Sequence, residues 1–230
     1  MKFSPPVVSC FPLPAFDARD WESATQAFES RERAPLLQGW RETQPEFRPA
    51  NVRIGWTREA LWFYAELEDD DAWNSATRPN ELTWTLGDVL EIFLRPLPGD
   101  PYFELHVTPQ NQTLEFYFQH SGDFGAVENG QFRRDLWHFH AAQIDESSRT
   151  WRVLAGVRWE PLSGTPPEEG AGWRFSCSRY DCTRGEDEPI HSSTSPHPDL
   201  DFHRQAEWGT LVFRRGDAPH ANAPQPQAPR

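Results

Sequence analysis

Hydrophobic and polar residues alternate with a period of two over most of the chain, which is the pattern of half-buried β-strands. In 151–159, for example, Trp151, Val153 and Ala155 share one face. The alternating segments are 52–56, 61–67, 89–95, 102–108, 113–119, 151–159 and 173–179, followed by a last strand at 208–213. Turn-forming segments such as PLPGD, TPQNQ and SGTPPEEGAG separate most of them. The pattern predicts an all-β fold, a single antiparallel β-sandwich of the immunoglobulin-like or jelly-roll-like kind.

One segment, 20–29, has helical spacing instead, because Trp21, Ala24 and Phe28 fall on one stripe. We therefore expect one short N-terminal helix. No internal repeat is visible, so residues 1–213 are assigned to one sandwich. The run 214–230 is rich in Pro, Ala and Gln and is expected to be a disordered tail.

Charge and composition exclude several functions. The chain has 22 basic and 35 acidic residues, a net charge of −13, so we expect no nucleic-acid partner. No apolar run is long enough to span a bilayer. Prolines interrupt the N-terminal apolar stretch, so no signal peptide is predicted. Cys10, Cys177 and Cys182 are an odd set and are expected to be unpaired structural thiols, although Cys177 and Cys182 could pair across a loop.

Three consecutive predicted strands, 89–95, 102–108 and 113–119, each carry one apolar and one polar face. The polar positions are Glu91, Arg95, Glu104, His106, Glu115 and Tyr117. One interpretation is a solvated outer face with ion pairs between strands. The other is a polar groove walled by tryptophans, which suits sugars because a pyranose stacks its C–H face on an indole while its hydroxyls bind polar groups.

The tryptophans divide into two groups. Trp56, Trp151 and Trp159 alternate with aliphatic residues and are expected in the core. Trp73 and Trp84 lie in, or at the end of, a polar loop, where an indole ring either covers a strand edge or contacts a ligand.

An ordered set of strings runs through the chain: NVRIGWTREALWFYAELEDDD, WTLGDVLEIFLRP, YFELHVTP, WRFSCSRYD and DFHRQAEWGTLVF, after an opening FDARDWESA. Together they resemble a family 9 carbohydrate-binding module, one of the DOMON-like β-sandwiches. The resemblance covers about 11–213, and GDVLEIFL is its sharpest element. It implies non-catalytic binding of an oligo- or polysaccharide in carbohydrate catabolism, with a glycoside hydrolase as a possible separate partner.

In members of that family, two aromatic rings hold a terminal sugar and polar side chains on adjoining strands hold its hydroxyls. The resemblance places the first ring at Trp84, a carboxylate at Glu91 and the second ring at Phe202, where the family usually has Trp. Four further candidates replace the family's Arg, Asn, Gln and Asn, and these are Glu104, His106, Ser178 and Asp199. Trp73 is the last ligand-binding candidate. The replacements leave the identity of the sugar open.

The family also carries structural calcium in its loops. Glu68, Asp69, Asp70 and Asp71 offer consecutive hard oxygen ligands at a strand end, and Asp69, Asp70 and Asp71 are the candidate calcium ligands. A solvated acidic strand end is the alternative interpretation.

Other metal centres are not expected. Haem-binding DOMON relatives hold iron with Met paired with His or Lys, and here Met1 and Lys2 are the only Met and Lys. That leaves only a bis-His arrangement for haem. His203 and Glu207 could face one way if 203–207 forms a helical turn, but three ligands with zinc spacing are not visible.

Three functions remain open. The first is carbohydrate binding, and the second is a glycoside hydrolase that uses Glu91 and Glu104. The third is an interaction sandwich without a ligand, in which Trp84 would pack flat against protein. GxSxG, P-loop and HExxH motifs are absent from the sequence. The compartment stays open, because the N-terminus suggests the cytoplasm whereas the family is mostly extracytoplasmic.

Overall fold

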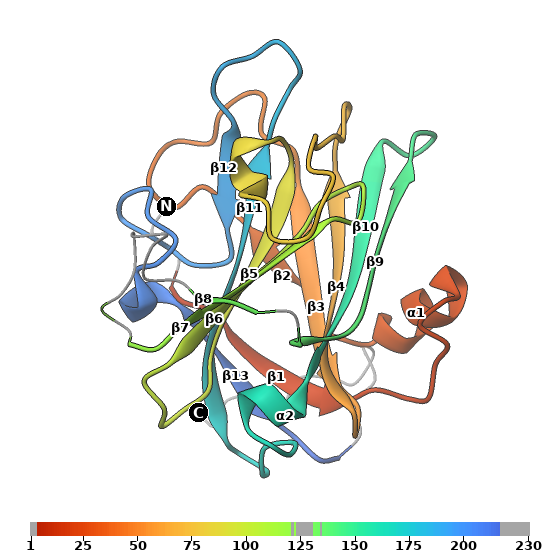
Figure 1. Ribbon diagram of the computed structural model, residues 1–230, viewed down its shortest axis with the longest axis vertical. Helices are drawn as coiled ribbons and strands as arrows, with labels where there is room; N and C mark the ends of the chain where they lie inside the picture. The colour runs from red at the N-terminus through yellow and green to blue at the C-terminus, as the bar shows by residue number, and fades with distance from the viewer. Residues whose placement is uncertain (1–3, 121, 123–130, 134, 217–230) are drawn as a thin grey trace, which may run out of the picture.

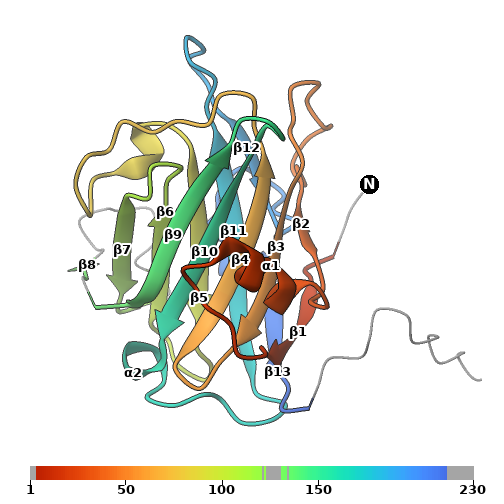
Figure 2. The same cartoon turned by 90° about the vertical axis from the view of Figure 1, so that its right-hand side faces the viewer.

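The computed structural model describes residues 4–120, 122, 131–133 and 135–216. These residues form thirteen strands that lie in two packed layers (Figures 1 and 2). The first layer contains β5 (Val89–Arg95), β6 (Tyr102–Val107), β7 (Thr113–Phe118), β8 (Gln131–Phe132), β11 (Gly172–Asp181), β12 (Ile190–Ser193) and β13 (Gly209–Phe213). The second contains β2 (Ala34–Leu36), β3 (Ala50–Trp56), β4 (Ala60–Glu68), β9 (Trp137–Asp145) and β10 (Thr150–Arg158).

Strand β1 (Val7–Pro12) belongs to both layers. Its first four residues pair with β13, and Phe11 and Pro12 pair with β3. Both pairings are parallel, whereas the other strand pairs are antiparallel. The predicted all-β sandwich is therefore confirmed, with β1 as a parallel link between its layers.

The main core fills the space between the layers. It is built from the apolar positions of the alternating strands, including Leu61 and Phe63 of β4 and Leu90 and Ile92 of β5. Trp151 and Trp159 are buried and Trp56 packs against this core, as predicted. Burial of these apolar side chains supplies the main favourable free energy of such a fold, at roughly 25 cal/mol per Å² removed from water.

Helix α1 (Trp21–Phe28) confirms the predicted N-terminal helix. It begins after Asp20, whose Oδ1 accepts a hydrogen bond from the Glu22 backbone N–H at 3.0 Å. The helix lies over the outer face of the second layer (Figure 2). Its buried side chains pack there, and Phe28 stacks on Tyr64 with ring centroids 5.4 Å apart. Short helical turns also occur at α2 (Trp159–Leu162), η1 (Thr83–Thr85) and η3 (Gln205–Glu207), which are too short to show a helical period in the sequence.

The outer face of the first layer carries a separate apolar cluster that includes Phe93, Phe116, Phe118 and Trp208. This cluster corrects one prediction, since Glu115 and Tyr117 do not share a face with Glu91 and Glu104. Glu115 Oε2 instead accepts a hydrogen bond from the Leu136 backbone N–H at 2.7 Å, and Tyr117 packs against the main core.

Two further predictions concern the cysteines and the tail. Cys10, Cys177 and Cys182 are all free thiols, which confirms that they are unpaired. The predicted tail lies outside the described residues from position 217 onward. Within the described chain, none of the helices is long and apolar enough to cross a membrane.

Candidate functional site

A cavity of about 360 Å³ opens on the outer face of the first layer. Strands β5, β6, β7 and β11 form its floor, and η1 and the segment before η3 contribute its walls. The lining residues are Trp84, Glu91, Glu104, Phe116, Phe118, Tyr180, Leu200, Asp201, Phe202 and His203. Its volume falls within the range of small-molecule binding sites.

Strand register brings the polar candidates to this face, because directly paired residues on neighbouring strands point to the same side. Glu91 pairs with His106 on β6 and with Ser178 on β11. Glu104 pairs with Phe93 on β5 and with Phe116 on β7.

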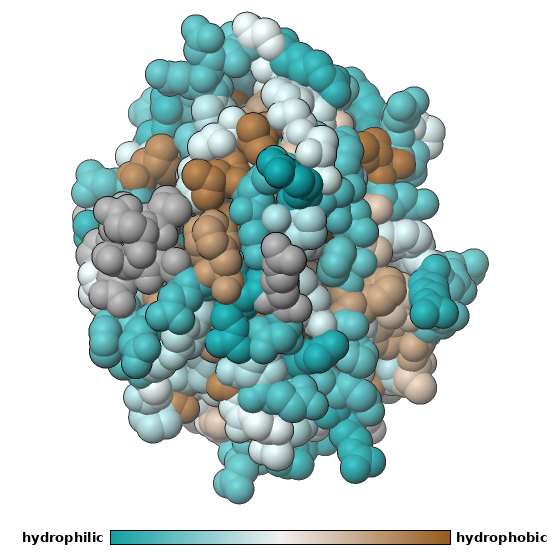
Figure 3. Space-filling view, viewed as in Figure 1, coloured by the Kyte–Doolittle hydropathy of each residue, from teal (hydrophilic) through white to brown (hydrophobic). Residues whose placement is uncertain are grey.

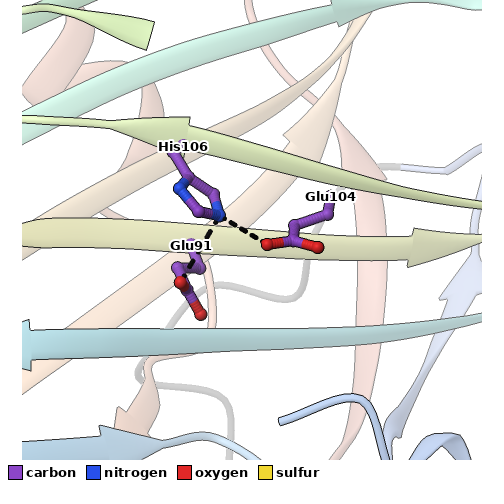
Figure 4. Close-up of side chains that lie close together, drawn as sticks. All are labelled: Glu91, Glu104 and His106. Carbon is purple, nitrogen blue, oxygen red and sulfur yellow. Dashed lines mark hydrogen bonds and ion pairs between the residues drawn. The ribbon is translucent and has the colours of Figure 1, made fainter. Parts of the chain in front are cut away.

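His106 is the centre of the polar contacts and is fully buried. Its Nε2 lies 2.8 Å from Glu104 Oε1 and 3.4 Å from Glu91 Oε1 (Figure 4), and its Nδ1 lies 2.7 Å from Thr83 Oγ1. Thr83 immediately precedes Trp84, so His106 connects the two carboxyl groups to the segment that presents the indole ring.

The environment disfavours two negative charges at this point. The pKa of Glu91 is raised well above its ordinary value, first by burial and then by the charge of Glu104. Burial, followed by the charges of Glu91 and Glu104, also raises the pKa of Tyr180.

The two aromatic candidates lie on the same cavity. Trp84 is half-buried, with its ring centroid 5.5 Å from that of His106 and 6.4 Å from that of Phe116. Phe202 is 5% exposed and packs edge-on against Trp40 and Tyr180. Trp84, Phe202 and Glu91 therefore converge on one open cavity, which the ligand-free interpretation did not expect.

Three candidates lie elsewhere. Ser178 is buried and its Oγ donates to Ser193 Oγ at 3.1 Å. The indole N–H of Trp73 donates to the Cys182 carbonyl at 2.7 Å. Asp199 is exposed and is not among the described residues that line the cavity, although the nearby Leu200 and Asp201 are.

His203 is the main site residue that sequence reasoning did not assign to the cavity. Its Nδ1 lies 3.0 Å from the Tyr102 hydroxyl and its Nε2 lies 3.7 Å from Glu104 Oε2. Glu207 instead accepts a hydrogen bond from Arg204 at 3.1 Å, so it does not join His203 in a metal site. The sequence feature that could have predicted this role is the position of His203 directly after Phe202.

The GD pair that opens GDVLEIFL has a structural explanation. Gly87 has a φ of 134°, and a Cβ there would lie 2.6 Å from the Trp73 carbonyl oxygen, so a larger residue would be strained. The Asp88 carboxyl accepts hydrogen bonds from the backbone N–H groups of Trp73 and Cys182, both at 2.6 Å. This pair therefore positions the start of β5, which carries Glu91.

The acidic run 69–71 does not gather around one point. Asp69 pairs with Arg179 at 2.9 Å, Asp70 pairs with two arginines, and Asp71 pairs with Arg184. Because these carboxylates are already neutralised by guanidinium groups, the donor set does not fit a calcium site at 69–71. The three acidic residues whose oxygens do converge are Asp69, Asp88 and Asp181, with Arg179 among them.

No family model and no curated protein matches the chain. Solved structures do match. A candidate carbohydrate-binding protein from Bacteroides uniformis is 17% identical, with a TM-score of 0.70 over 92% of this chain and 100% of that chain. A family 9 carbohydrate-binding module from Caldicellulosiruptor kristjanssonii is 15% identical over 97% of this chain and 100% of that chain. Its complexes with cellotriose and with glucose give TM-scores of 0.62 and 0.63. The chain therefore has the fold of the family 9 modules.

Proposed function

We propose that the protein binds carbohydrate without cleaving it, with a sugar ring held in the cavity between Trp84 and Phe202. The observation that carries the proposal is the convergence of these two rings with Glu91 and Glu104 on one open cavity. An indole ring offers an apolar face to a pyranose, while carboxylate oxygens accept hydrogen bonds from its hydroxyls. Similar folds captured with glucose and cellotriose support this assignment.

The geometry favours binding over hydrolysis. One oxygen each of Glu91 and Glu104, together with a nitrogen of His106, lie within 4.8 Å of one another. Glycosidases place their two carboxyl groups on either side of the scissile bond. Here both groups extend from adjacent strands toward the same imidazole, as Figure 4 shows.

The direct test is calorimetric titration with glucose, cellotriose and a wider panel of oligosaccharides. Trp84→Ala should weaken binding about tenfold, since it removes the stacking surface. Trp21→Ala is the matched control, because Trp21 is also half-buried but lies on α1 against the other layer. If no sugar in the panel binds, or if Trp84→Ala binds like the unmodified protein, the proposal is wrong.

The proposal extends to a role in carbohydrate catabolism beside a separate glycoside hydrolase, as the family resemblance implies. In that role, addition of the protein should raise the rate at which such an enzyme degrades an insoluble polysaccharide. Trp84→Ala should abolish the increase. An unchanged rate with the unmodified protein would limit the function to binding.

A further inference from the structure

The cavity combines aromatic rings with acidic groups. Five of its lining residues are aromatic, and three others carry carboxyl groups: Glu91, Glu104 and Asp201. Neither Lys nor Arg occurs among the lining residues in the described ranges. A site for an acidic sugar would be expected to include a guanidinium group.

Glu91 is the least satisfied of these groups. It is 3% exposed and lines the cavity. Among the described residues, its carboxyl makes one polar contact, the 3.4 Å approach to His106 Nε2, and no hydrogen bond. A buried carboxyl normally has hydrogen-bond partners, so this group is free to accept them from a ligand.

Glu104 is satisfied on one side only. Its Oε1 faces His106 at 2.8 Å, while its Oε2 lies 3.7 Å from His203 Nε2, beyond hydrogen-bond distance. The imidazole of His106 is therefore shared by two carboxyl groups, and it cannot fully compensate both. A cationic hydrogen-bond donor from outside the protein would supply the missing hydrogen bonds and positive charge to these two carboxyl groups.

We propose that the cavity selects a sugar that carries a free protonated amine, an inference that rests on the proposed carbohydrate binding. An ammonium group donates three hydrogen bonds, which suits carboxyl groups at more than one position. It is also attracted to the faces of aromatic rings, and Trp is the strongest such partner. The aromatic walls favour an organic cation over a bare metal ion, which would make no use of them.

The overall charge agrees with this assignment. The protein has a net charge of −13, so its field attracts a cationic ligand. Burial, followed by the charge of Glu104, raises the pKa of Glu91, and a bound ammonium group would oppose that shift.

The test compares glucosamine, glucose and N-acetylglucosamine by calorimetric titration at pH 6. These three differ only at one ring substituent, which is a charged amine, a hydroxyl or an uncharged amide. We expect glucosamine to bind at least tenfold more tightly than glucose, and N-acetylglucosamine to lose that advantage. Glu91→Gln and Glu104→Gln should each reduce the ratio of glucosamine affinity to glucose affinity, and a cooperative thermal unfolding transition for each variant would show that it is folded.

Glu66→Gln is the control, because Glu66 is paired with Arg53 in the other layer and should not alter the preference. Equal affinity for glucose and glucosamine would overturn this inference and leave the proposed function intact. Failure of every sugar to bind would overturn the proposed function itself.

Discussion

The described residues include two compact buried acidic groups, which differ in what compensates their charge. Glu91 and Glu104 surround His106 beneath one open cavity, whereas Asp69 and Asp181 pair with Arg179 and line a separate cavity of about 340 Å³. In the aspartate group a guanidinium supplies the positive charge, since Arg179 lies 2.9 Å from Asp69 and 3.3 Å from Asp181.

The aspartate group is a structural connection between the layers. Arg179 extends from β11 of the first layer, and its Nη1 donates to the carbonyl of Glu68 at the end of β4 in the second layer. Both oxygens of Asp88 also accept backbone hydrogen bonds. Every member of this group therefore has partners within the protein.

Among the described residues no guanidinium pairs with the glutamate group, and this difference supports the proposal that it belongs to the ligand site. Polar groups that a fold needs for itself are satisfied internally, because an unpaired buried charge is costly. A buried carboxyl that faces a cavity without a partner is instead available to a ligand. The face of the molecule in Figure 3 is mostly hydrophilic, with small hydrophobic patches.

The comparison is tested most strongly by removing the cation of the aspartate group. Arg179→Met should lower the free energy of unfolding by about 3–5 kcal/mol, because Asp69 and Asp181 would remain buried without a counter-charge. Urea denaturation followed by tryptophan fluorescence measures the change. A loss below about 1 kcal/mol would show that Arg179 does not compensate this group.

The segment that carries Phe202 provides a second test, through the pH dependence of stability. His197 is fully buried, neither ring nitrogen makes a hydrogen bond among the described residues, and its ring centroid lies 5.9 Å from that of Phe202. Burial lowers its pKa to about 4, so the unfolded chain binds a proton at a higher pH than the folded one. The stability that neutral His197 contributes is therefore present above about pH 6.5 and is lost as the pH falls toward 4.

Relative to His197→Phe, the unmodified protein should lose about 2–3 kcal/mol more stability between pH 6.5 and pH 4. Parallel denaturation curves at several pH values measure the difference. Identical pH profiles for the two proteins would mean that His197 does not control the acid stability of this segment.

Glu91 should have the opposite pH dependence. Its folded-state pKa is raised, so its contribution to stability is complete below about pH 4.5 and is lost as the pH rises through the folded-state pKa. Glu91→Gln should therefore raise the free energy of unfolding at pH 7 by about 1 kcal/mol, and it should flatten the alkaline side of the profile. Thermal unfolding without ligand measures this effect, and a destabilised variant would indicate that Glu91 is satisfied internally.

Strand positions and core residues could be predicted from the sequence, because period-two alternation records which residues share a face. It does not record which face is inside when both faces of a sheet are covered. Leu114, Phe116 and Phe118 form the outer cluster on β7, so Glu115 and Tyr117 point inward. The prediction failed there because the first layer has an apolar cluster on each side.

The candidate site could be predicted in part. Trp84, Glu91, Glu104 and Phe202 line the cavity, and His106 lies directly beneath it. His203, Tyr180 and Asp201 were not assigned to it, because loop conformation and the pairing of distant strands bring them there. Ser178 was predicted to bind the ligand but does not line the cavity. It pairs with Glu91 as expected, yet neighbouring serines that the sequence pattern could not place cover it.

Substitution of Ser178 is therefore expected to have the smallest effect on stability and sugar affinity. Its hydroxyl donates to Ser193 Oγ, and the hydroxyls of Ser176 and Ser195 complete a buried cluster. Ser178→Ala should cost about 1 kcal/mol of stability through the lost hydrogen bond, and it should change sugar affinity less than twofold. Both variants, Trp84→Ala and Ser178→Ala, are titrated in parallel with the sugar that the unmodified protein binds most tightly. The comparison separates a residue that contacts the sugar from one that only stabilises the fold. A tenfold loss for Ser178→Ala would place a sugar hydroxyl at Ser178 and move the binding site from the described cavity toward β12.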